Sequence, residues 1–276
     1  MTSILPLIMA AAVVPLQGAF RSAREYDRPS FRYRPPEAAQ LERARQLFAA
    51  LARALAPGPP PAELVTKAKA AGFELLAGQD AGGEIWIVRE LEGHRAGAGF
   101  YALRAKGLPV CIQAPHTFFD EGTGDLALAT FAALHASCLC TNTVHRRALD
   151  VAHAEQSVFL AATEALLEAC KWPLVQLHGF AADSQPADVA AVVSEGTQKP
   201  NVGVRLQKAL RVEPGRVLLY PRDTKELGGT TNVEGSRARA AGVLFLHIEM
   251  SPTFREKLLD TSAPLVAALR EVLTPP

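Results

Sequence analysis

The sequence has no excess of charge of either sign. Its 276 residues include 29 lysines and arginines and 28 aspartates and glutamates, which leaves a net charge of +1. No basic stripe interleaved with aromatic residues is present, so the composition gives no support for nucleic-acid binding. An acidic tail and low-complexity tracts are also absent, which argues against a disordered chain. With this length and 49% hydrophobic residues, the chain can bury a sizeable core.

Long hydrophobic runs are almost missing as well. One run, ILPLIMAAAVVPL at 4–16, is too short to cross a bilayer but has the length of a signal-peptide core. Small residues in QGAF at 17–20 supply a cleavage site, although no lysine or arginine precedes the run. We therefore expect a signal peptide at 1–20, a periplasmic or secreted protein, and no stable membrane insertion after processing. The alternative is a buried N-terminal helix in a cytoplasmic protein.

Cysteine is scarce, and its spacing excludes two common roles. The four cysteines each lie in apolar sequence: Cys111, Cys138, Cys140 and Cys170. The two tightly spaced ligand pairs of an all-cysteine zinc site are absent. On a strand, Cys138 and Cys140 would face the same side, where they are poorly placed to bridge each other. We therefore expect buried free thiols. The Gly-x-Ser-x-Gly turn of serine hydrolases is absent too.

Strands and helices alternate along most of the chain. Predicted strands cover 84–90, 98–105, 109–115, 137–142, 173–180, 189–196, 216–221 and 241–250. Predicted helices cover 35–56, 63–73, 125–136, 150–171, 201–212 and 253–273. This order predicts an α/β fold: a mixed, mostly parallel twisted sheet with helices on both faces, preceded by a helix and a β-hairpin. We place a helical segment with a proline-rich break at 21–60 and one α/β domain at 61–276.

Histidines, carboxylates and an arginine gather at the ends of the predicted strands. They are His116 and Glu121 after one strand, Asn142, His145 and Arg146 after the next, His178 in a third, and His247 with Glu249 in the last. Open α/β sheets bind ligands at the carboxyl ends of their strands. We therefore expect these side chains at one edge of the sheet.

These residue types suit metal-assisted hydrolysis. Two imidazoles and a carboxylate can hold zinc and leave an open position for water. The ion lowers the pKa of that water to ~7 and polarises a carbonyl, while a separate carboxylate moves the proton. His116 and Glu121 are then candidate ligands, with Asp120 as the alternative carboxylate. A guanidinium such as Arg146 can hold a substrate carboxylate or an oxyanion.

Three motifs, in the same order along the chain, resemble those of a known group. PHTFFDEGTGDLA at 115–127 is similar to the His-Gly-Gly-x-x-Glu-x-Gly-Thr segment of zinc-dependent poly-γ-glutamate hydrolases, relatives of N-formylglutamate amidohydrolase and carboxypeptidase A. VQLHGF at 175–180 resembles their second histidine strand. The segment 230–256 resembles their terminal Asn…Arg…Gly-Val-x-Leu-Glu-x-Ser…Arg block. The resemblance implies an amidohydrolase or carboxypeptidase-like fold.

The resemblance also implies roles for single residues. His116, Glu121 and His178 would be the ligands of Zn²⁺, and Glu249 the general base. Arg237 matches the arginine of the terminal block. The implied reaction is hydrolysis of an amide bond in a small-molecule or peptide-like substrate with a carboxylate: an N-acyl amino acid, a peptide C-terminus or a γ-glutamyl polymer. By analogy with carboxypeptidases, Asn142 and Arg146 would hold a substrate carboxylate or the oxyanion. Substrate binding is also expected of His145 and Arg237.

Departures from the family pattern leave a second function open. Thr117 and Phe118 replace the two glycines after the first histidine, and NVEGSR at 232–237 replaces an Asn-x-x-Asn-Arg element. The alternative is a metal-free binding or scaffold protein on the same fold. Outside the motifs, Asp150 is expected to cap a helix that also carries His153. Glu195 is a further carboxylate with no assigned role.

Overall fold

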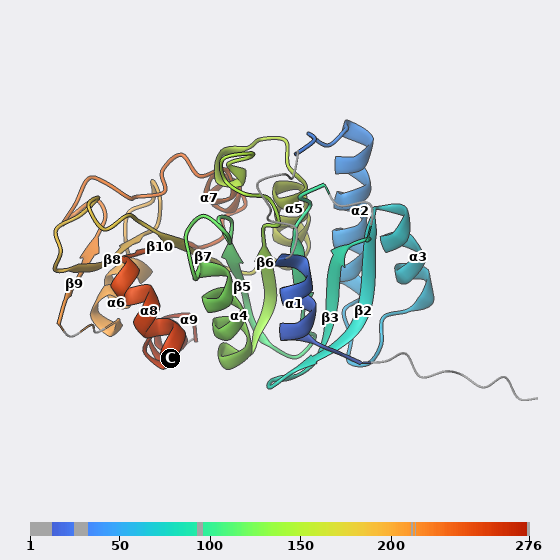
Figure 1. The fold of residues 1–276 in the computed structure, drawn as a ribbon, viewed down its shortest axis with the longest axis horizontal. Helices are drawn as coiled ribbons and strands as arrows, with labels where there is room; N and C mark the ends of the chain where they lie inside the picture. Colours follow the sequence, from blue (N-terminus) through green and yellow to red (C-terminus); the bar gives the residue numbers. More distant parts are fainter. Residues whose placement is uncertain (1–12, 25–32, 93–95, 211, 213, 275–276) are drawn as a thin grey trace, which may run out of the picture.

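A computed structural model describes residues 13–24, 33–92, 96–210, 212 and 214–274 (Figure 1). These residues form one ten-stranded sheet between two layers of helices. In their order across the sheet, the strands are β1 (Val14–Pro15), β2 (Phe73–Asp80), β3 (Gly83–Glu90), β4 (Phe100–Leu103), β6 (Ala136–Thr141), β5 (Leu108–Ala114), β7 (Leu174–Gly179), β10 (Phe245–Met250), β8 (Val189–Ser194) and β9 (Arg216–Leu219).

The sheet combines parallel and antiparallel pairs. Pairing is parallel for β1–β2, β6–β5, β5–β7, β7–β10 and β8–β9. It is antiparallel for β2–β3, β3–β4, β4–β6 and β10–β8. The predicted mixed, mostly parallel α/β sheet is therefore confirmed. The strands β6, β5, β7 and β10 form a continuous parallel block, so their carboxyl ends meet at one edge of the sheet.

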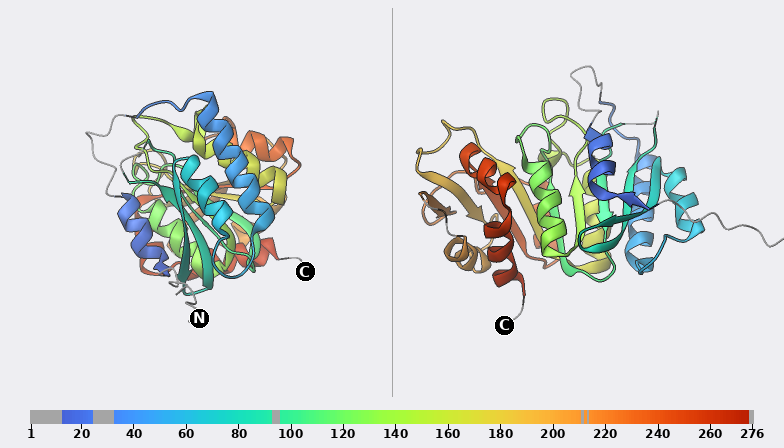
Figure 2. Two further views of the ribbon diagram at one scale, coloured as in Figure 1. Left: turned by 90° about the vertical axis from the view of Figure 1, so that its right-hand side faces the viewer. Right: turned by 60° about the horizontal axis from the view of Figure 1, so that its bottom comes forward.

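Helices cover both faces of the sheet (Figure 2). On one face lie α1 (Leu16–Arg24), α4 (Thr123–Leu134), α6 (Val202–Ala209), α8 (Pro252–Asp260) and α9 (Ala263–Leu273). On the other face lie α2 (Ala38–Ala54), α3 (Ala62–Ala70), α5 (Val158–Cys170) and α7 (Val233–Ala240). Successive residues of a strand point to opposite faces, so Ile112 joins the first core and Cys111 the second.

Several elements differ from the sequence prediction, each for a local reason. The helix predicted at 150–171 is interrupted: a short 3-10 helix covers Val151–His153, and α5 starts after Ser157, whose side chain accepts a hydrogen bond from the amide of Leu160. The predicted helix at 253–273 is also two helices, because the backbone at Thr261 is extended. The predicted hairpin of β3 and β4 is present, and β2 and α7 were not predicted.

The N-terminal segment packs on the sheet as far as the structure describes it. β1 pairs with β2, and Leu16 and Phe20 of α1 are buried, with the Phe20 ring 5.5 Å from that of Phe100. Removal of 1–20 would therefore expose part of the core. Residues 1–12 of the predicted signal peptide lie outside the described residues, so that segment stays a prediction. Among the described helices, none is both long and apolar enough to span a membrane.

Candidate metal centre

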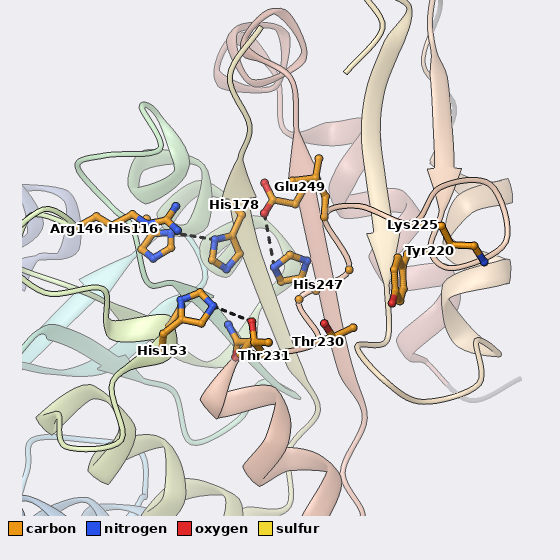
Figure 3. A pocket seen from close by; sticks show the side chains of 15 residues that line it. His116, Arg146, His153, His178, Tyr220, Lys225, Thr230, Thr231, His247 and Glu249 are labelled. Carbon is orange, nitrogen blue, oxygen red and sulfur yellow. Dashed lines mark hydrogen bonds and ion pairs between the residues drawn. The ribbon is translucent and has the colours of Figure 1, made fainter. Parts of the chain in front are cut away.

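Three ligand atoms meet where β5 and β7 end. His116 lies two residues beyond β5, and His178 is the penultimate residue of β7. The Nδ1 atoms of the two histidines are 3.2 Å apart (Figure 3). The Oδ2 atom of Asp120 lies 3.3 Å from each of these nitrogens. All three side chains are buried, so the group lies at the floor of the site rather than on the surface.

The carboxylate beside the histidines is Asp120, not Glu121. The amide nitrogen of Asp120 donates a 2.9 Å hydrogen bond to the carbonyl of His116, so one tight turn returns Asp120 to the ring. Glu121 is one residue further and is exposed, with its carbonyl accepting a hydrogen bond from Arg255 Nε. The amide of Gly179 donates to Asp120 Oδ2 at 3.0 Å. This placement corrects the expectation for Glu121 and selects the alternative carboxylate.

Both histidines are held through their second ring nitrogen. His116 Nε2 lies 2.8 Å from Asp150 Oδ1, and His178 Nε2 lies 3.2 Å from Gln176 Oε1. An ionised carboxylate and an amide oxygen can only accept, so each Nε2 carries the ring proton. The two Nδ1 atoms face each other and Asp120. Burial lowers the pKa of His116, but hydrogen bonds to Asp120 and Asp150 outweigh it and raise that pKa, so in the metal-free protein His116 Nδ1 can carry a proton that a bound ion would replace.

The spacing of the three atoms can be compared with that of zinc ligands. Tetrahedral zinc with bonds of ~2.0–2.1 Å holds its ligand atoms ~3.3–3.4 Å apart. The observed separations are 3.2 and 3.3 Å. Burial opposes the ionisation of Asp120, but its interactions with the His116 and His178 rings outweigh it and keep its pKa below the usual range. Burial lowers the pKa of His178 to about 4, so this ring is neutral at pH 7. The donor set therefore fits a divalent ion.

Asp150 connects the metal centre to its surroundings. Its Oδ1 also lies 3.1 Å from His153 Nδ1, and its Oδ2 accepts a 3.0 Å hydrogen bond from Arg146 Nε. Burial opposes ionisation, but the hydrogen bond from His116 outweighs it and lowers the pKa of Asp150. Its side chain makes no helix-capping hydrogen bond, so the expected N-cap role is corrected. The carboxylate instead orients His116 and Arg146.

A second carboxylate lies beside the triad without belonging to it. Glu249 is paired in register with His178 across β10 and β7, and its Oε1 is 3.8 Å from His247 Nε2. Burial, and to a smaller extent the negative charge of Asp120, raises the pKa of Glu249 to about 8. The ring of His247 lies 4.6 Å from that of His178. Glu249 is therefore a buried acid whose affinity for a proton is high.

A cavity of about 260 Å³ opens over these groups. Its lining includes His116, Arg146, His178 and Glu249, and the segment 227–232 forms another part of the wall (Figure 3). Asp150 engages the Nε of Arg146, and the guanidinium carbon lies 5.5 Å from the centre of the Phe119 ring. The arginine is thus fixed at the cavity wall, where it can meet an anionic group.

Three other residues expected to bind substrate do not line this cavity. Asn142 is buried, and its side chain exchanges hydrogen bonds with the backbone of Val144. His145 Nδ1 accepts a hydrogen bond from the amide of Arg147. Arg237 pairs with Glu155 and Glu164 on the outer side of α7 and α5. Glu195 accepts hydrogen bonds from the amides of Asn201 and Gly203 at the start of α6, a structural role.

The sequence interpretation missed a layer of polar side chains beneath His178. Gln176, Asn232 and Glu234 are buried there, and Gln113 extends the layer on β5. Burial raises the pKa of Glu234 to about 8. The available signal was Gln176 itself, because a glutamine in the apolar run VQL, two residues before His178, points to the same face as that histidine.

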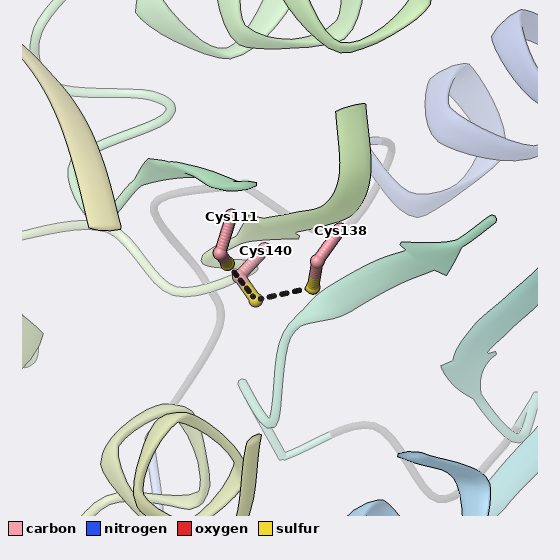
Figure 4. Close-up of side chains that lie close together, drawn as sticks. All are labelled: Cys111, Cys138 and Cys140. Carbon is pink, nitrogen blue, oxygen red and sulfur yellow. Dashed lines mark hydrogen bonds between the residues drawn. The ribbon is translucent and has the colours of Figure 1, made fainter. Parts of the chain in front are cut away.

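A second cluster of three ligand-type atoms lies on the neighbouring strands (Figure 4). Cys140 Sγ is 3.5 Å from Cys111 Sγ and 3.6 Å from Cys138 Sγ. All three thiols are buried in the core shared with α2 and α5. Burial raises the pKa values of Cys111 and Cys138 well above the usual range, which keeps these two groups as thiols. Burial opposes the ionisation of Cys140 too, but hydrogen bonds from Cys111 and Cys138 outweigh it and lower the pKa of Cys140 to about 5. The three cysteines are free and lie buried in this core, as the sequence predicted.

Comparisons with known proteins find likeness in structure but not in sequence. No family model matches the chain, and no curated protein matches it. The structure is similar to an N-formylglutamate amidohydrolase from Ralstonia eutropha, with 13% identity, a TM-score of 0.45, and coverage of 61% of this chain and 93% of that one.

A bacteriophage poly-γ-glutamate hydrolase gives 12% identity and a TM-score of 0.36, with coverage of 60% of this chain and 84% of that one. The cell shape determinant Csd4 from Helicobacter pylori gives 12% identity and a TM-score of 0.41, with coverage of 62% of this chain and 52% of that one. The group that the motifs resemble is thus among the similar structures. At these scores the likeness carries no conclusion about activity.

Proposed function

We propose that this protein is a metal-dependent hydrolase that cleaves an amide bond, with zinc as the ion. The main support is the arrangement of His116 Nδ1, His178 Nδ1 and Asp120 Oδ2, three atoms of metal-ligand type that lie 3.2–3.3 Å apart. A second hydrogen bond holds each of the two rings.

The side chains around the cavity have the roles that such a reaction needs. His116, Asp120 and His178 would hold the ion, which when bound lowers the pKa of water and polarises a carbonyl. Glu249 would take a proton from water and deliver it to the leaving amine. Its pKa, raised to about 8 by burial, makes it a stronger base than an exposed glutamate.

Arg146 would orient the substrate. Its Nε is bound to Asp150, which leaves the two terminal nitrogens to form a forked pair with a carboxylate. A small cavity with one such cation favours an N-acyl amino acid or a peptide C-terminus over the interior of a polymer. We therefore place a substrate carboxylate at Arg146 and the scissile carbonyl near the triad.

The direct test is hydrolysis by the zinc-loaded protein. An N-acyl glutamate, a blocked dipeptide and a γ-glutamyl polymer would be incubated with it, and release of free amine measured. We expect cleavage of one of the small carboxylates, loss of activity after chelation and recovery when zinc is returned. Arg146→Gln should raise KM about tenfold or more for the acid and leave the amidated substrate unaffected. A zinc-loaded protein that binds these acids without cleaving them would support the binding protein instead.

A further inference from the structure

Gln176 lies beneath the metal centre with all of its hydrogen-bonding capacity used. Its Oε1 accepts from His178 Nε2 at 3.2 Å and from Asn232 Nδ2 at 2.7 Å. Its Nε2 donates to Gln113 Oε1 at 2.9 Å and to Glu234 Oε2 at 3.3 Å. A glutamine amide has two acceptor sites and two donor hydrogens, so none remains unpaired. Rotating the amide by half a turn would bring like groups together at Asn232 and at Gln113.

The orientation of this amide is fixed from one side by the start of α7. Asn232 caps that helix, with its Oδ1 accepting a 2.9 Å hydrogen bond from the backbone amide of Gly235. A backbone amide can only donate, so the oxygen of Asn232 must face Gly235 and its NH2 must face Gln176. Gln176 therefore presents its oxygen to Asn232, and the same oxygen faces His178.

The orientation is fixed independently from the other side by α5. Thr163 Oγ1 donates to the carbonyl of Phe159 at 2.9 Å, so it accepts from Gln113 Nε2 at 3.0 Å. The oxygen of Gln113 must then face Gln176 and receive its NH2. Two backbone groups, on two different helices, thus require the same orientation of Gln176.

We propose that Asn232 and Gln176 set the tautomer of His178, keeping its proton on Nε2 and leaving Nδ1 free to bind an ion. Both are positioning residues, since neither of them supplies one of the three ligand atoms. The tautomer itself follows from hydrogen bonds alone. Its consequence for metal affinity rests on the function proposed above. Glu234 completes the support by accepting from the amide of Gln176.

The sharpest variant is Asn232→Asp. Aspartate still caps a helix, but its second oxygen cannot donate to Gln176. A hydrogen bond to the charged carboxylate is stronger than the one to the neutral Gln113 Oε1, so the Gln176 amide would turn to donate to the new carboxylate. Its NH2 would then face His178 Nε2, and the proton of His178 would move to Nδ1. The matched control is Asn201→Asp, the same substitution at the exposed start of α6.

The measurement uses metal-free full-length protein labelled with ¹⁵N. Imidazole ¹H–¹⁵N correlation spectra at pH 7 report which ring nitrogen carries the proton, with His178 assigned from the signals missing in His178→Gln. We expect the Nε2–H form in the wild type and in Asn201→Asp, and the Nδ1–H form in Asn232→Asp. In a chelator competition, Asn232→Asp should bind zinc about 10- to 100-fold more weakly.

Two results would overturn the proposal: an Nδ1–H tautomer for His178 in the wild type, or an unchanged tautomer in folded Asn232→Asp. If Asn232→Asp does not fold, Asn232→Ser keeps a cap and removes the amide, and a mixture of tautomers is then expected. The same tautomer in Asn232→Ser as in the wild type would count against the proposal. A wild type with the Nε2–H form that binds no zinc would support the tautomer assignment and refute the proposed function.

Discussion

The metal centre and the cysteine cluster each bring three ligand-type atoms together, and they use neighbouring strands of one sheet. His116 and Asp120 follow β5, and His178 lies on β7, whereas the thiols lie within β5 and β6. The metal centre borders a cavity, and its two histidines form hydrogen bonds through Nε2 with Asp150 and Gln176. The thiols lie inside an apolar core.

The difference shows that surroundings, not proximity, make a metal site. Ionising three thiols would place negative charges among apolar side chains, where charge is very costly. The histidines instead donate hydrogen bonds from Nε2 to Asp150 and Gln176, and their Nδ1 atoms face each other and Asp120. The predictions below test this contrast, from the largest expected effect to the smallest.

Replacing the proposed base should have the largest effect. In Glu249→Gln the side chain keeps its shape but cannot take a proton, so we expect kcat to fall by about 10²- to 10⁴-fold. Zinc content should stay at the wild-type level, because Glu249 is not one of the three ligands. Activity would be measured by amine release and metal by elemental mass spectrometry. Near-wild-type activity would remove Glu249 from the mechanism.

Glu234→Gln should change how stability depends on pH. The folded-state pKa of about 8 exceeds the usual 4.5, so the folded protein binds more protons than the unfolded chain between these values. The contribution of Glu234 to stability is therefore present below about 4.5 and is lost as pH rises through 8. Between pH 5 and pH 8, the free energy of unfolding of the variant should rise by up to about 4 kcal/mol relative to that of the wild type. Urea unfolding at each pH would measure it. The exposed Glu168→Gln should show no such trend.

Asp150→Asn tests the outer support of His116. The neutral amide is a weaker acceptor and loses the charge that attracts the ring proton, so zinc affinity should fall by about 10- to 100-fold. Chelator competition would give the dissociation constants. Asp188→Asn serves as the control, because Asp188 pairs with Arg216 at the surface. Equal affinities in the two variants would show that Asp150 does not support the ligand.

Cys138→Ala should have the smallest effect and none on the ion. Loss of a buried thiol should cost about 1 kcal/mol of folding free energy, measured by urea unfolding. Zinc affinity and kcat should match the wild type. A loss of bound metal in this variant would give the cysteine cluster a role that its apolar surroundings argue against.

The location of the site could be predicted from the sequence, whereas the order of the strands across the sheet was not predicted. His116, His178 and Glu249 follow or end apolar runs, and parallel strands bring such positions to one edge. The choice between Asp120 and Glu121 depends on one tight turn after His116, which spacing alone does not determine. The role of Asp150 arises because a 3-10 helix, not an α-helix, follows it. Contacts such as that between Asn232 and Gln176 join residues 56 positions apart and require the fold.

The most direct test is the metal content of purified protein after zinc loading and removal of excess ion. We predict about one zinc per chain in the wild type and in the variant with Cys111, Cys138 and Cys140 all changed to alanine. His116→Ala and His178→Ala should each lose it while keeping the circular dichroism spectrum of a folded α/β protein. A folded wild type without zinc, or zinc lost with the cysteines and kept without the histidines, would contradict the proposed metal centre.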